Sequence, residues 1–172
     1  ARKHDSQDIC FVPDGDYAKV IENRTGKTPE PGPFLDLNGN VIGTHRGIIH
    51  YTVGQRRGLR MPSDGKIYVV RILPEQNAVV VGPNEALFTR ECFVPGMHWI
   101  SGEAPALPFR CSAKTRYRQP EQPCTVYPAG VHGVRLVFDE PLRAITPGQS
   151  AVLYDGDTVL GGGIIAREES VC

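Results

Sequence analysis

The sequence predicts a mainly β protein, with a small α+β central domain followed by an all-β C-terminal barrel. The first observation is that 15 prolines and 19 glycines are spread through 172 residues, which favours short strands and turns over long helices. The second is that β-branched runs recur after Gly82 at a spacing of about 8–12 residues, as in small barrels and sandwiches. Hydrophobic residues make up 40% and charged residues 22%, which is typical of a globular chain with a modest core.

Three segments are expected along the chain. Residues 1–13 are polar at first and then apolar, and they form an extended arm. Residues 14–82 form the central domain and residues 83–172 form the barrel. The boundary is placed near Pro83, although the hairpin expected at 67–82 suits either side of it.

The central domain is expected to begin with a short helix. Asp14 or Asp16 can cap its start, and Gly26 suits the position just past its end. Residues 34–45 then predict a hairpin, in which Asn38-Gly39 supplies the positive φ angles of a tight turn.

Further strands follow, after one ambiguous segment. Residues 45–60 fit a helical turn or a strand, because their glycines interrupt both patterns. Residues 67–73 and 78–82 are β-branched runs joined by "PEQN", which predicts a second hairpin. The strands expected in the barrel are 92–100, 109–118, 123–127, 133–138, 149–154 and 158–166.

Charge and cysteine content limit the function classes. Lysine plus arginine equals aspartate plus glutamate at 19 each, so a nucleic-acid surface must come from local clustering. No stretch approaches the roughly 20 apolar residues of a membrane span, and no signal peptide is expected. The five cysteines are widely and irregularly spaced and form no C-x-x-C, so neither a disulfide framework nor a metal site is expected. A reducing cytoplasm is the expected compartment.

Cys10, in the stretch "DSQDIC", is the first candidate for chemistry. Asp5 and Asp8 would raise the pKa of its thiol, while Lys3 and His4 would offset them. Two interpretations stay open on these residues alone: a small buried side chain, or a thiol that is activated by groups elsewhere.

Two basic clusters are candidates for RNA binding. One combines Arg56 and Arg57 with nearby basic and aromatic residues. In the other, Lys114, Arg116 and Arg118 alternate, and on a strand they would share one face at a spacing of about 6–7 Å, close to that of phosphates. Tyr117 would then face the core unless the strand is bulged. A solvated charged face explains the same pattern equally well.

Two features near the C-terminus need separate interpretations. The run "LGGGII" at 160–165 has no following Lys-Ser/Thr, so we expect a bulged or tightly packed strand instead of a phosphate loop. Gln149 follows a proline-glycine turn and either reads a base edge or caps that turn.

Four motifs in matching order resemble the bacterial tRNA-specific 2-thiouridylases, once labelled tRNA methyltransferases. They are "DSQDICF", "HYTVGQRRGL", "KTRYRQ" with "PCTV", and "FDEPLRAITPGQSAVLY" with "LGGGII". The resemblance covers essentially the whole chain but only the C-terminal half of the enzyme. The S-G-G-x-D-S loop of the family's ATP-pyrophosphatase domain is absent, so we expect this chain alone to be inactive.

The resemblance implies that sulfur replaces the C2 oxygen of the wobble uridine in tRNA. The missing N-terminal domain would use ATP and magnesium to adenylate that oxygen. A sulfur-relay protein would deliver sulfur as a persulfide on Cys10, which attacks C2, and a second cysteine, absent here, would help release it through a disulfide.

The resemblance also implies a tRNA-binding set. It assigns Arg116 and Tyr117 to tRNA contact and Gln149 to a contact near the anticodon. The further members of the expected set are Lys114, Arg118, Arg56 and Arg57, while Gln55 belongs to a structural or RNA-facing motif.

Two alternatives remain. One is a self-standing, non-catalytic RNA-binding β-barrel, and the other is a thiol redox protein using Cys10, which the lack of a nearby resolving cysteine disfavours. Cys92, Cys111 and Cys124 are expected in the barrel core, and Cys172 is expected to be exposed.

Overall fold

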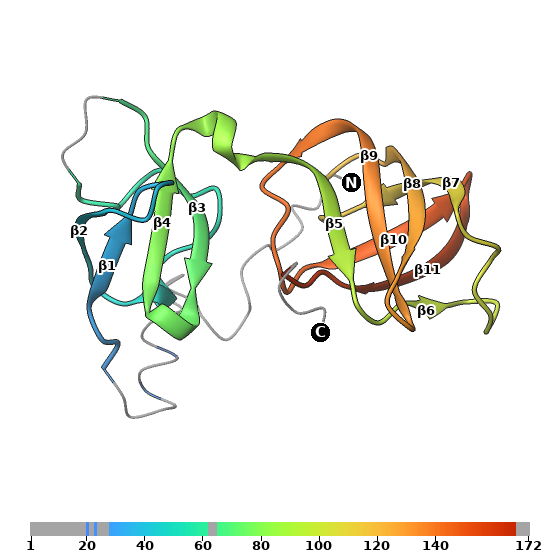
Figure 1. The fold of residues 1–172 in the computed structure, drawn as a ribbon, viewed down its shortest axis with the longest axis horizontal. Helices are drawn as coiled ribbons and strands as arrows, with labels where there is room; N and C mark the ends of the chain where they lie inside the picture. The colour runs from blue at the N-terminus through green and yellow to red at the C-terminus, as the bar shows by residue number, and fades with distance from the viewer. Residues whose placement is uncertain (1–19, 21–22, 24–27, 62–64, 168–172) are drawn as a thin grey trace, which may run out of the picture. The chain divides into compact units, whose positions relative to one another are not determined.

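The computed structural model describes residues 28–61 and 65–167, together with Val20 and Asn23. These residues form two compact units, which divide between Pro83 and Asn84 (Figure 1). Of the helix expected before Gly26, only Val20 and Asn23 are described, and both are helical. The expected arm with Cys10, and the terminal Cys172, lie outside the described residues.

The first unit contains a four-stranded sheet in the order β2-β1-β4-β3 (Figure 1). β1 (Gly32–Leu35) and β2 (Val41–His45) form one antiparallel hairpin, and β3 (Tyr68–Leu73) and β4 (Ala78–Gly82) form another. A short 3₁₀ helix, η2 (Pro74–Gln76), joins β3 to β4. Both expected hairpins are confirmed. β1 and β4 pair in parallel at the centre, which explains why all five residues of β4 are buried.

The turn of the first hairpin differs from the prediction. The Asp36 carboxylate accepts hydrogen bonds from the backbone N–H groups of Asn38 and Asn40, both at 2.8 Å. Its hydrogen bond with the Asn40 side chain is the main cause that lowers the pKa of Asp36. Within this turn only Gly39 has a positive φ, of 86°, so the expected positive φ at Asn38 is wrong. The Asp36 side chain organises a longer loop in place of a two-residue turn.

The ambiguous segment after β2 forms a 3₁₀ turn, η1 (Ile48–His50), followed by irregular turns. It closes the core of the first unit, where the rings of Phe34, His45 and Tyr51 meet edge-on at 5.3–5.6 Å between centroids. His45 Nδ1 accepts from the Gly47 N–H, and Nε2 donates to the Asn77 carbonyl, both at 3.0 Å. Burial lowers the pKa of His45, so the ring is neutral.

The second unit is a seven-stranded antiparallel sheet in the order β5-β9-β8-β7-β10-β11-β6. The 3₁₀ turn η3 (Asn84–Leu87) leads into it. Its strands are β5 (Phe88–Val94), β6 (His98–Trp99), β7 (Phe109–Lys114), β8 (Gln122–Ala129), β9 (Gly133–Arg143), β10 (Ser150–Asp155) and β11 (Thr158–Ile164).

This sheet curls until its far strands meet. A bridge pairs Phe93 in β5 with Ala166, just past β11, and the Ala166 N–H donates to the Phe93 carbonyl at 2.9 Å. Figure 1 shows the strands wrapped around a common interior. The predicted fold class, mainly β with a C-terminal barrel, is therefore confirmed.

The glycine run lies in β11, where the backbone is crowded. A Cβ atom on Gly161 would lie 2.4 Å from the His98 carbonyl, and one on Gly163 would lie 2.5 Å from the Gly96 carbonyl. The pairing of β10 with β11 also shifts between Leu153 and Tyr154. The expected bulged, tightly packed strand is confirmed.

Several expected strands have different limits. The strand expected at 92–100 is two strands, because the chain leaves the sheet at Pro95–Gly96. The strand expected at 109–118 ends at Lys114. Among the cysteines, Cys92 and Cys124 are buried in the barrel core as expected, and Cys111 is half-buried against it.

Candidate nucleic-acid interface

The chain leaves β7 at Lys114 and enters a tight turn. The Gln119 N–H donates to the Arg116 carbonyl at 3.1 Å, and the buried Thr115 hydroxyl donates to Gln119 Oε1 at 2.8 Å. The expected row of three cations on one strand face is wrong, because the turn interrupts the alternation after Lys114. Tyr117 is at the exposed part of this turn, with 89% of its surface accessible, and does not face the core.

Arg116 connects this turn to the loop between β9 and β10. Its Nη2 donates to the Ala144 carbonyl at 2.7 Å and to Thr146 Oγ1 at 3.1 Å. Ala144 has a positive φ of 55°, a conformation that costs energy for a residue other than glycine. The half-buried guanidinium therefore stabilises an unusual loop conformation.

Gln149 lies in the same loop and is exposed. Its N–H donates to the Thr146 carbonyl at 3.2 Å, and its own carbonyl accepts from the Ile165 N–H at 2.8 Å. The backbone of Gln149 is therefore fixed while its side chain is accessible. The structure thus connects the turn that contains Arg116 and Tyr117 with the loop that contains Gln149. Gln149 lies at least 32 residues further along the sequence.

The other two expected cations of this cluster differ from each other. Lys114 Nζ lies 3.4 Å from Glu121 Oε1 and 5.1 Å from the centre of the Tyr154 ring. Glu121 also accepts a hydrogen bond from Ser112 at 2.8 Å, so it is fixed beside the lysine. Arg118 is exposed. Of the two, Arg118 is the more available to a phosphate, because a carboxylate already neutralises Lys114.

The first unit holds the remaining expected residues. Arg56 and Arg57 are exposed on a loop that Gln55 organises. Gln55 Oε1 accepts from the Thr52 N–H, and its Nε2 donates to the Arg57 carbonyl, both at 2.9 Å. Backbone bonds at 2.8 and 2.9 Å tie Gly54 and Gln55 to Val69 of β3. Gln55 is therefore a structural residue that presents two accessible arginines.

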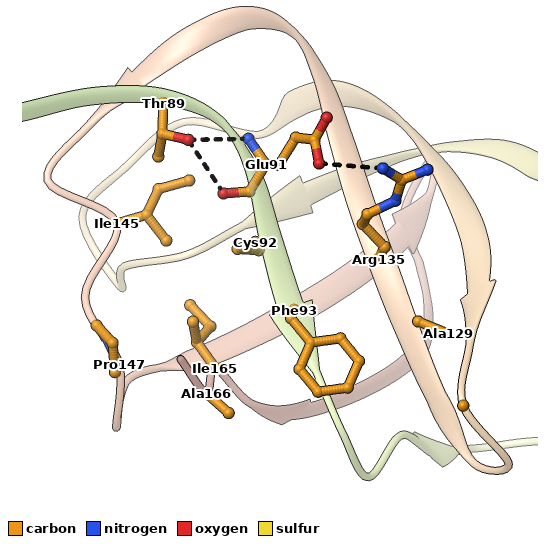
Figure 2. Close-up of a pocket in the computed structure, with 11 residues that line it drawn as sticks. Thr89, Glu91, Cys92, Phe93, Ala129, Arg135, Ile145, Pro147, Ile165 and Ala166 are labelled. Atoms are coloured by element: carbon orange, nitrogen blue, oxygen red, sulfur yellow. Dashed lines mark hydrogen bonds and ion pairs between the residues drawn. The ribbon is translucent and has the colours of Figure 1, made fainter. Parts of the chain in front are cut away.

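A pocket of about 330 Å³ lies beside the β9–β10 loop in the second unit (Figure 2). Its apolar lining includes Cys92, Phe93, Ile145 and Ile165, and its polar side carries Glu91. Glu91 Oε2 lies 3.3 Å from Nη1 of Arg135, as the dashed line in Figure 2 shows. Burial raises the pKa of Cys92 to about 12, so its thiol stays protonated and is a poor nucleophile.

Sequence reasoning missed this pocket. Its walls come from strand and loop segments between Thr89 and Ala166, and most of its residues are ordinary apolar side chains. Only the closure of the barrel brings them together.

The part of the chain that the structure describes contains neither a cluster of metal ligands nor a membrane-spanning helix. There, no group of three or more His, Cys, Asp or Glu side chains could hold a metal ion. Within the same residues, no helix is long and apolar enough to cross a membrane.

Two family models match the chain. The tRNA methyl transferase PRC-barrel domain matches residues 18–83, and the aminomethyltransferase beta-barrel domain matches residues 89–165. A tRNA-specific 2-thiouridylase of Acetivibrio thermocellus is 51% identical over 165 residues, covering 96% of this chain and 46% of that protein. The chain belongs to the tRNA-specific 2-thiouridylase family. The resemblance inferred from the four motifs is therefore confirmed.

Other relatives agree with this assignment. The tRNA-specific 2-thiouridylase of Symbiobacterium thermophilum is 47% identical over 97% of this chain and 43% of that protein. The tRNA-specific 2-thiouridylase of Halothermothrix orenii is 43% identical over 95% of this chain and 46% of that protein. The chain spans about half the length of the curated relatives it matches. The second domain match contains Arg116, Tyr117 and Gln149, whereas Cys10 precedes the residues matched by either model.

Proposed function

We propose that this chain supplies the tRNA-binding surface and the sulfur-carrying cysteine of an enzyme that 2-thiolates the wobble uridine of tRNA. The observation that supports this most is the connection between the Tyr117 turn and the Gln149 loop through Arg116. It places an exposed aromatic ring, a cation and an amide on adjoining segments of one domain. These are the groups that bind single-stranded RNA in an anticodon loop.

Each residue of this surface has a distinct role. Tyr117 stacks on an unpaired base, since its ring is almost fully accessible. Arg118 binds a phosphate, and Gln149 hydrogen-bonds to a nucleotide near the anticodon. Arg116 acts mainly by holding the Gln149 loop. Arg56 and Arg57 add phosphate contacts of the kind that depend on salt. Lys114 adds one only when it leaves its ion pair with Glu121.

Cys10 carries the transferred sulfur as a persulfide, received from a sulfur-relay protein. This role rests on the motif "DSQDIC" and on the family, because Cys10 lies outside the described residues. ATP and magnesium would act in the N-terminal domain of the whole enzyme. We place this enzyme in the cytoplasm. We assign the residues of this chain no step in adenylation.

A thiolation assay tests the proposal. The full-length enzyme and this chain would each be incubated with ATP, magnesium, a persulfide donor and unmodified tRNA, and 2-thiouridine would be measured by mass spectrometry of the nucleosides. We expect the full-length enzyme to thiolate the wobble uridine, and this chain to bind tRNA without thiolating it. If the full-length protein bound tRNA but transferred no sulfur, a non-catalytic RNA-binding module would be the correct interpretation.

A further inference from the structure

Two cysteines face each other across neighbouring strands of the barrel. Cys111 in β7 and Cys124 in β8 are register partners, and their Sγ atoms lie 3.7 Å apart. Directly opposed residues on antiparallel strands point to the same face of the sheet. Their Cα atoms are typically about 4.5–5.5 Å apart, which lies within the range that disulfides span. Small rotations of the two side chains can therefore bring the sulfurs to the bonding distance of about 2.05 Å.

The two thiols are not equivalent. Cys124 is fully buried, whereas Cys111 is half-buried and thus partly accessible. The hydrogen bond with the Cys124 thiol lowers the pKa of Cys111 despite partial burial, and Arg110 lowers it further. The same hydrogen bond raises the pKa of Cys124. Asp139 holds the Arg110 guanidinium through two hydrogen bonds of 2.6 and 2.7 Å, so this cation stays beside the pair.

We propose that Cys111 and Cys124 form a redox-active dithiol, which a hydroperoxide converts reversibly into an intramolecular disulfide. The Cys111 thiolate attacks one peroxide oxygen, the O–O bond breaks, and Cys111 becomes a sulfenic acid while the leaving oxygen takes a proton. The Cys124 sulfur then attacks the Cys111 sulfur, the S–O bond breaks, and water leaves with the Cys124 proton. The two thiols lose two electrons, which the peroxide gains. This chemistry is separate from that of Cys10 and does not depend on the proposed function.

The position of the pair gives the disulfide a structural consequence. Cys111 and Cys124 flank the hairpin connection that presents Arg116 and Tyr117. A disulfide between them would fasten β7 to β8 at the base of this connection and restrict separation of the two strands.

Peptide mapping tests the proposal on the chain itself. The fully reduced protein would be exposed to hydrogen peroxide, its free thiols alkylated, and the product digested with trypsin without reduction. Cleavage after Arg110, Lys114, Arg118 and Arg135 places the two cysteines in separate peptides, 111–114 and 119–135. We expect a linked peptide whose mass is the sum of the two minus two hydrogens, together with the loss of alkylation at both sites. Dithiothreitol should restore both alkylated peptides.

Variants separate this pair from the other cysteines. Cys92, in peptide 91–110, is the matched control, and C92A should leave the yield of the linked peptide unchanged. C124A should instead accumulate sulfenic or sulfinic acid on Cys111. The proposal is overturned if Cys111 and Cys124 stay alkylatable while other cysteines of the wild-type chain oxidise. Linkage of Cys111 mainly to a cysteine other than Cys124 would overturn it equally.

Discussion

At the scale of single residues, Tyr117 is the almost fully exposed aromatic side chain that we propose stacks on an RNA base. Replacing Tyr117 with alanine should weaken tRNA binding by about 1–3 kcal/mol, the usual value of one stacked base. The melting temperature should not change, because 89% of this residue is exposed. Filter binding and thermal unfolding would check this. Val131, which is 91% exposed on another turn, gives a matched control, and V131A should change neither quantity. Unchanged tRNA binding in Y117A would show that the turn does not contact RNA.

We expect Arg116 and Arg118 to have different roles, although they are only two residues apart. R116A removes two hydrogen bonds to the Ala144–Thr146 segment, so it should lower both the melting temperature and the affinity for tRNA. R118A should leave stability unchanged and reduce the slope of log affinity against log salt by about one phosphate contact. Binding would be measured over a series of salt concentrations. Equal melting temperatures for R116A and the wild type would refute the holding role of Arg116.

His45 makes the first unit sensitive to acid. Burial lowers its pKa from the usual 6.5, so below this pH the unfolded chain takes up a proton that the folded chain does not. Stability is therefore complete above pH 6.5 and falls as the pH decreases, by at most about 1.4 kcal/mol per pH unit. Hydrogen exchange of the β4 amides, corrected for intrinsic rates, would measure this between pH 7.5 and 5.5. H45Q should be less stable overall but should lose this slope; an unchanged slope in H45Q would contradict the assignment.

The RNA-binding roles assigned to single residues stay predictions, and only the exposure of those side chains can be compared with the structure. Tyr117 and Gln149 were selected from motifs, and the structure shows both to be exposed. The cation row failed because the hydrogen bonds of Thr115 and Gln119 form a turn, which side-chain alternation does not reveal. The link from Arg116 to Ala144 could not be predicted either, since it joins segments that only the folded sheet brings together.

At the scale of secondary-structure elements, the packing of β11 requires that two of its three glycines, Gly161 and Gly163, have no side chain. G161A and G163A should each destabilise the barrel by about 1–3 kcal/mol, because the added methyl group meets a backbone carbonyl at 2.4 and 2.5 Å. G162A is the matched control, since its Cβ would lie 3.1 Å from the nearest atom and should cost less. Chemical denaturation followed by the fluorescence of Trp99 would rank the three. Equal stabilities of the three variants would show that the backbone around Gly161 and Gly163 is not crowded as described.

Strand centres were predictable and strand ends were not. The β-branched runs correctly placed β3, β4 and most strands of the barrel. β9, however, continues to Arg143, five residues past the expected end at 138 and through Pro141. This extension pairs with β5 but not with β8, so one side of Pro141 has no strand to bond to. Such partial pairing is a property of the sheet and leaves no local sequence pattern.

At the scale of the whole molecule, composition and turn spacing were enough to predict a mainly β chain with a C-terminal barrel. The parallel pairing of β1 with β4, and the bridge between Phe93 and Ala166, join residues far apart in sequence and were not predicted. The pocket beside the β9–β10 loop was missed for the same reason. The family assignment came from long motifs, which carry more information than periodicity.

The effect of Cys10→Ser on the full-length enzyme tests most directly whether Cys10 carries the transferred sulfur. Wobble-uridine thiolation and tRNA affinity would be measured for the same preparation of the variant, with Cys92→Ala as a control in a buried cysteine. If Cys10 carries the persulfide and the described surface holds tRNA, C10S abolishes 2-thiouridine formation, tRNA affinity stays at the wild-type value, and C92A retains thiolation. Thiolation by C10S at the wild-type rate would contradict the account.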